Sequence, residues 1–129
     1  MLLKANMRKI TLFFIIFFMS SPTHAEWELY SATSDYTIYF FDRQTIKKNK
    51  GKVKVWVLVD YQRSPERTVK SNIVHNEIDC NNDTVELLYM NSYSENNGKG
   101  NLVSSNKHQH KIPIPPNSQI RDLMKIICN

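Results

Sequence analysis

The chain has 129 residues, with 17 basic and 12 acidic side chains and a formal net charge of +5. Three of the basic residues lie within the first nine positions, and without that segment the net charge falls to +2. So small a charge excludes a general polyanion-binding role, and we expect no nucleic-acid partner. The length allows one small domain with a modest core.

The first 25 residues have the three-part pattern of a secretory signal peptide. Lys4, Arg8 and Lys9 precede the apolar run Ile10–Met19, and small residues end at Ala25. The run is too short to span a bilayer. No cysteine follows it at a cleavage position, so we expect neither a membrane span nor a lipid anchor. We therefore predict a signal peptide at 1–25 and one exported domain at 26–129, located in the periplasm, on the cell surface or secreted.

Most of the exported part reads as β-strand, because apolar and β-branched residues alternate at period two. A turn at Asn49-Lys50-Gly51 should join the second and third strands as an antiparallel hairpin. In the third strand, valines occupy one face and Trp56 and Leu58 the other, which is typical of a strand covered on both sides. The predicted strands are Trp27–Ser31, Tyr36–Asp42, Lys52–Gln62, Ser71–Cys80, Thr84–Tyr93 and Leu102–Ser105.

A single helix is expected at the C-terminal end. Pro113, Pro115 and Pro116 should end sheet pairing, and Ser118 is a suitable N-cap. The apolar residues then recur at helical spacing and form one stripe. A helix of about ten residues is marginal in isolation, so it has to pack against the sheet. The stripe comprises Ile120, Leu123, Met124, Ile127 and Cys128.

The chain contains two cysteines, Cys80 and Cys128. In an oxidising compartment an isolated pair is most simply one disulfide, whereas two free thiols would suit a cytosolic protein. Because Cys128 lies on the apolar stripe, a bond to Cys80 would tether the helix across one face of the sheet. The expected fold class is α+β: an antiparallel sheet of about six strands with a disulfide-tethered C-terminal helix.

Two surfaces are candidates for binding. One short helix shields only one face of a sheet, so the opposite apolar face should be closed by a second subunit or a partner, unless strong curling covers it. The second candidate is a basic run that contains no acid and suits an anionic glycan or an acidic protein, although lysines also protect exposed sheet edges. The run comprises Arg43, Lys47, Lys48, Lys50, Lys52 and Lys54.

Other motifs favour structural roles over chemistry. His108-Gln109-His110 lies in a polar loop without a third metal ligand nearby, and His75 should be a packing or edge residue. Gly98-Lys99-Gly100 is a turn and not a phosphate cradle. No nucleophile–base pair or cofactor motif can be assembled, so we expect no enzyme, no metal and no cofactor.

Several short motifs in a fixed order resemble those of the surface-adhesin protein E family, and the likeness covers nearly all of the exported part. The motifs are Y-F-F-D-x-x-x-I at Tyr39–Ile46, V-W-V-L-x-D-Y at Val55–Tyr61, E-I-D-C at Glu77–Cys80, G-K-G at Gly98–Gly100, P-x-S at Pro116–Ser118 and the near-terminal Cys128.

The resemblance implies an antiparallel sheet of about six strands, with the helix tethered to its concave side, and a tendency to dimerise. It also implies a protein-binding function, since the named member of the family is an outer-membrane adhesin for host extracellular-matrix proteins. We therefore expect an exported, non-enzymatic binding domain. The alternative is a periplasmic accessory or inhibitor protein that caps a partner in the cell envelope.

Overall fold

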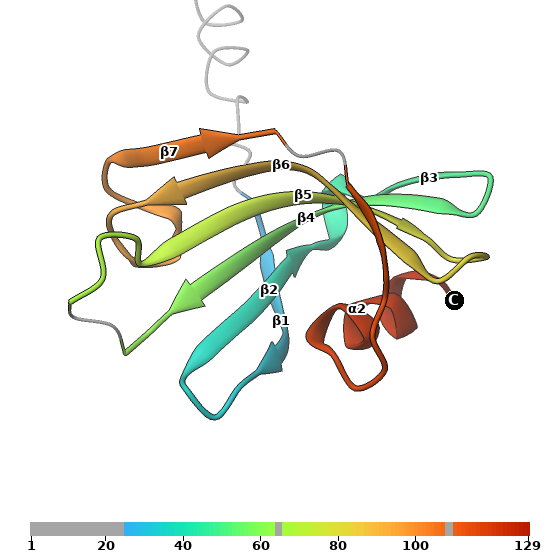
Figure 1. The fold of residues 1–129 in the computed structure, drawn as a ribbon, viewed down its shortest axis with the longest axis horizontal. Coiled ribbons are helices and arrows are strands. Elements are labelled where there is room, and N and C mark those ends of the chain that lie inside the picture. The colour runs from blue at the N-terminus through green and yellow to red at the C-terminus, as the bar shows by residue number, and fades with distance from the viewer. Residues whose placement is uncertain (1–24, 64–65, 108–109) are drawn as a thin grey trace, which may run out of the picture.

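The computed structural model describes residues 25–63, 66–107 and 110–129 (Figure 1). The predicted signal peptide, apart from Ala25, lies outside the described residues. None of the described helices has the length and apolar character needed to cross a membrane.

All strands belong to one antiparallel sheet, which follows the order β1-β2-β4-β5-β6-β7. Two further short strands add to it, β3 beside β4 and β8 beside β6. This confirms the predicted sheet and the hairpin between the second and third predicted strands. The strands are β1 (Trp27–Ala32), β2 (Thr37–Asp42), β3 (Lys47–Asn49), β4 (Lys52–Tyr61), β5 (Ser71–Asp79), β6 (Thr84–Tyr93), β7 (Leu102–Asn106) and β8 (Lys111–Pro113).

The prediction that Pro113 ends sheet pairing is wrong, because Pro113 lies in β8 opposite Thr84 of β6. Proline lacks the backbone N–H that a second neighbour would need. Since β8 pairs with β6 alone, Pro113 is tolerated at its outer end. The connection between the second and third predicted strands contains two elements that were not predicted, the one-turn 3-10 helix η1 (Arg43–Thr45) and the strand β3.

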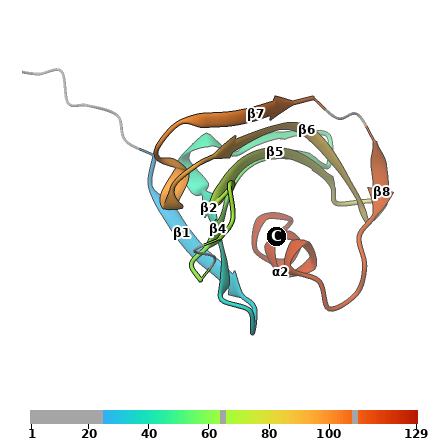
Figure 2. The ribbon, with the colours of Figure 1, turned by 60° about the vertical axis from the view of Figure 1, so that its left-hand side comes forward.

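The helix α2 (Gln119–Ile127) lies inside the curve of the sheet, and Figure 2 shows the strands bending around it. The Ser118 side chain caps it by accepting a hydrogen bond from the backbone N–H of Arg121 at 3.2 Å. The buried helix residues Leu123 and Ile127 belong to the same core as Val55 and Val57 of β4. The predicted stripe is therefore the packing face, and we call the sheet surface against it the inner face.

Part of the opposite surface, here the outer face, is closed by the segment 94–101, which contains the 3-10 helix η2 (Asn96–Gly98). Leu58 is only 2% exposed although it points away from α2. A Cβ on Gly98, whose φ is +70°, would lie 2.8 Å from Ile73 Cδ1, so glycine permits this close approach. The chain thus covers one end of the outer face itself, a feature that was not predicted from the sequence.

Two buried polar residues hold this covering segment in place. Asp60, 1% exposed, accepts hydrogen bonds from Asn96 Nδ2 at 3.1 Å and from the backbone N–H of Asn97 at 2.9 Å. Ser71 Oγ accepts from the backbone N–H of Gly98 at 2.9 Å. These bonds satisfy side chains that would be costly to bury alone.

Candidate functional site

The two cysteines form the predicted disulfide. Cys80 follows β5 and Cys128 follows α2, and their Cα atoms lie 5.7 Å apart. The bond fastens the end of the helix to the end of a central strand, so both sulfurs are committed to structure. Neither cysteine is a free thiol.

The first residue of the basic run, Arg43, is already paired. Its Nε and Nη2 donate to the two carboxylate oxygens of Glu28 at 2.8 and 3.2 Å. This bidentate bond raises the pKa of the Arg43 guanidinium, which also lies 5.1 Å from the centre of the Phe41 ring. The charge of Arg43 is therefore engaged by groups of the protein itself.

The lysines of the run separate into two sets on the β3–β4 hairpin, which projects beyond the sheet (Figure 1). Lys47 and Lys54 are cross-strand neighbours, and Lys52 is paired with Asn49 on the same face. These three, the lysine group, line a hollow of about 260 Å³ together with Asn49 and Glu77.

The other two lysines point elsewhere. Lys48 is the cross-strand partner of Val53, whose side chain is in the core, so it belongs to the inner side of the sheet. Lys50 lies at the turn with φ +51°. Within the lysine group, Lys52 Nζ approaches Glu77 Oε1 at 4.0 Å. Three ammonium groups face one carboxylate, so the hollow has a net positive charge.

An aromatic row lies beside the lysine group on the outer face. The rings of Trp56 on β4 and His75 on β5 stack with centroids 4.2 Å apart and planes 5° apart. Tyr89 on β6 approaches Trp56 edge-on at 6.5 Å. The Tyr89 hydroxyl accepts a hydrogen bond from Ser105 Oγ on β7 at 2.7 Å. The row therefore spans three neighbouring strands with half-buried side chains.

His75 is electrostatically linked to the lysines. Burial lowers the pKa of its imidazole, and the positive charges of Lys54 and Lys47 lower it further. The ring is thus held in its neutral form near pH 7, where it extends the flat apolar surface of Trp56. From the sequence, His75 was predicted to be a packing or edge residue. The aromatic row was not predicted, because the register that aligns β4, β5 and β6 cannot be read from any one strand.

The described residues contain no group of three or more His, Cys, Asp or Glu side chains that could hold a metal ion. His108 and Gln109 lie outside the described residues. What the outer face offers chemically is a flat aromatic surface bordered by positive charge, which suits recognition of another molecule.

A curled antiparallel sheet with a disulfide-tethered C-terminal helix on its inner face defines the α+β fold class predicted from the sequence. The family described as Surface-adhesin protein E matches residues 27–129, and the chain belongs to that family. No curated protein matches the sequence significantly.

Solved structures of Haemophilus influenzae protein E share the fold. One matches with a TM-score of 0.61 and 18% identity, covering 85% of this chain and 90% of the other. Protein E from non-typeable Haemophilus influenzae matches with a TM-score of 0.56 and 18% identity, covering 85% and 81%. At this identity the likeness establishes the fold alone.

Proposed function

We propose that the chain is an exported, non-enzymatic adhesin-type domain that binds a protein through its outer face. The aromatic row and the lysine group form the binding surface. The observation that carries the proposal is the Trp56–His75 stack, which lies beside the lysine group on the side of the sheet that α2 does not cover. Aromatic side chains are enriched in the energetically dominant parts of protein interfaces.

The charge of this surface selects the class of partner. Lys47 and Lys54 make no salt bridge to the described residues, so their ammonium groups are available to acidic side chains or to the anionic groups of a glycan. Positive charge at the rim of an interface mainly accelerates association and excludes positively charged partners. We therefore propose acidic extracellular-matrix or other host proteins as partners, with glycan-borne anions as an additional contact.

A paired set of charge reversals tests this surface. The oxidised mature protein is applied to immobilised extracellular-matrix extract, and retention is compared between Lys47→Glu/Lys54→Glu and Lys48→Glu/Lys50→Glu. Both double variants change the net charge equally, but only the first changes the outer face. Loss of retention in the first variant alone supports the proposal, and equal behaviour of the two variants refutes it.

The homodimer expected from the sequence would use the same face. Light scattering across a range of concentrations measures it directly. A dimer that becomes a monomer when Trp56 is replaced by Ala places the second copy on the aromatic row. If the protein is a monomer at all concentrations, the homodimer is excluded and the outer face is available to a different protein.

Location separates the adhesin from the alternative of a periplasmic accessory or inhibitor protein. Protease treatment of intact cells degrades a surface-displayed domain and spares a periplasmic one. We expect the domain to be degraded, because the proposed partners are outside the cell. Protection until the outer membrane is opened would instead favour the accessory role.

A further inference from the structure

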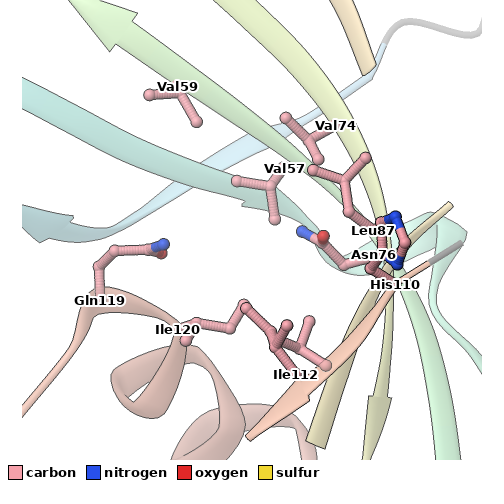
Figure 3. Close-up of a pocket in the computed structure, with 10 residues that line it drawn as sticks. Val57, Val59, Val74, Asn76, Leu87, His110, Ile112, Gln119 and Ile120 are labelled. Carbon is pink, nitrogen blue, oxygen red and sulfur yellow. The ribbon is translucent and has the colours of Figure 1, made fainter. Parts of the chain in front are cut away.

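A cavity of about 250 Å³ separates the first turn of α2 from the inner face of the sheet (Figure 3). It lies on the opposite side of the sheet from the aromatic row. Aliphatic side chains from five elements form most of its wall, namely Val57 and Val59 of β4, Val74 of β5, Leu87 of β6, Ile112 of β8 and Ile120 of α2.

A carboxamide on the inner face of the sheet lines this cavity. Asn76 of β5 is 8% exposed and lies between Val55 and Leu87 in the sheet register, on the inner face. Its side chain makes no hydrogen bond to any other described residue. As far as the described residues go, its donor and acceptor are therefore available to a molecule in the cavity.

A second carboxamide points into the same space from the helix (Figure 3). Gln119 Oε1 accepts a hydrogen bond from the Tyr30 hydroxyl. Burial raises the pKa of Tyr30, so this phenol stays protonated and continues to donate. The bond fixes the orientation of the Gln119 amide and leaves its Nε2 hydrogens available to a molecule in the cavity.

We propose that this cavity binds a short alkyl chain that carries an uncharged carbonyl group, such as an acyl amide or ester. The aliphatic wall accommodates the chain, and Asn76 Nδ2 and Gln119 Nε2 donate to the carbonyl oxygen. A 150 Å³ apolar cavity admits benzene, so the present volume accommodates about ten non-hydrogen atoms.

The headgroup is neutral because the cavity supplies no fixed charge. Among the described residues that line it, His110 is the only one with an ionisable side chain, and it is exposed to solvent. A carboxylate placed against the aliphatic wall would lose its hydration without gaining a paired charge. Octanamide, with ten non-hydrogen atoms, and its charged analogue octanoate are therefore suitable probes.

The test is a nuclear magnetic resonance titration of the oxidised, isotope-labelled mature protein with octanamide. We expect saturable shifts at residues around the cavity, with a dissociation constant below about 1 mM. Leu87→Trp, which fills the cavity, should abolish the shifts. Ile126→Trp, placed on the exposed side of α2, should leave them unchanged. An absence of saturable shifts, or equal shifts in Leu87→Trp, would overturn the proposal.

Two comparisons test the headgroup. Asn76→Leu keeps the side-chain size and removes the donor, so octanamide should bind about tenfold more weakly. For the unaltered protein, octanoate should bind at least that much more weakly than octanamide. Unchanged octanamide affinity in Asn76→Leu, or tighter binding of octanoate, would contradict the assigned carbonyl site. The octanoate comparison needs no variant and so holds even if Asn76→Leu does not fold.

Discussion

Trp56 and His75 are cross-strand neighbours whose rings stack almost in parallel, 4.2 Å apart, on the side of the sheet away from the helix. Two positions earlier on β4, Lys54 is opposite Glu77. A period-two register therefore places a flat apolar surface directly beside the lysine group. This arrangement is the physical basis of the proposed partner surface.

The stack should make stability depend on pH. Because burial lowers the pKa of His75 below its usual 6.5, the unfolded chain takes up a proton at a higher pH than the folded protein does. The free energy of unfolding should therefore fall as the pH drops from about 7 to 5. Urea denaturation at a series of pH values measures this. The control is His75→Phe, which retains the stacking ring without a titrating group and should show a smaller fall over the same range; an equal fall would contradict the assignment.

The disulfide should contribute a large part of the stability. Cys80 and Cys128 are separated by 48 positions, and the chain-entropy relation for such a loop gives about 4 kcal/mol. The double variant Cys80→Ser/Cys128→Ser should lose roughly that amount of unfolding free energy in urea titrations. Added reductant should destabilise the parent protein and leave the double variant unaffected. Equal stability of the two proteins would show that packing alone fixes the helix.

The two sides of α2 should respond differently to truncation. Leu123 is fully buried against the inner face, so Leu123→Ala should cost about 2–5 kcal/mol through lost burial and a residual cavity. Ile126 is 39% exposed, and Ile126→Ala should cost under about 1 kcal/mol, since exposed positions rarely matter more. Thermal or urea unfolding of the pair measures the difference. Similar losses would contradict the packing face described for the helix.

Asp60 should hold the segment 94–101 against the outer face of the sheet. Asp60→Ala removes the acceptor of the Asn96 and Asn97 hydrogen bonds, and we expect a loss of about 1–3 kcal/mol. Release of the segment 94–101 should also uncover Leu58 and increase the binding of a fluorescent apolar dye. Hydrogen exchange provides the readout: amides of 94–101 should exchange faster in the variant. Unchanged exchange there would mean that Asp60 does not hold the segment.

The sequence predicted the elements with strong periodic signals. The strand at Lys52–Gln62, the helix after Ser118 and the disulfide are all confirmed. The short strands β3 and β8 were missed because three residues carry no usable period. Pro113 argued against pairing, and a proline is acceptable in β8 only because this strand pairs with a single neighbour, β6.

The candidate site was harder to predict, because it depends on contacts between segments distant in the chain. The basic run indicated a positively charged region, but the hairpin register divides it and Glu28 pairs with Arg43. The Trp56–His75 stack arises from the pairing of β4 with β5. The Asp60 side chain that anchors 94–101 over Leu58 offers no local signal, since a lone Asp in a strand is usually exposed.

Binding of immobilised extracellular-matrix extract by Trp56→Ala tests the central claim most directly. Trp56 is the centre of the proposed surface, and truncation of such an aromatic residue typically costs at least about 2 kcal/mol of binding free energy, or roughly thirtyfold in affinity. Ile126→Ala on the exposed side of α2 is the control and should bind as the parent protein does. If Trp56→Ala remains folded and binds with undiminished affinity, the outer face is not the partner surface.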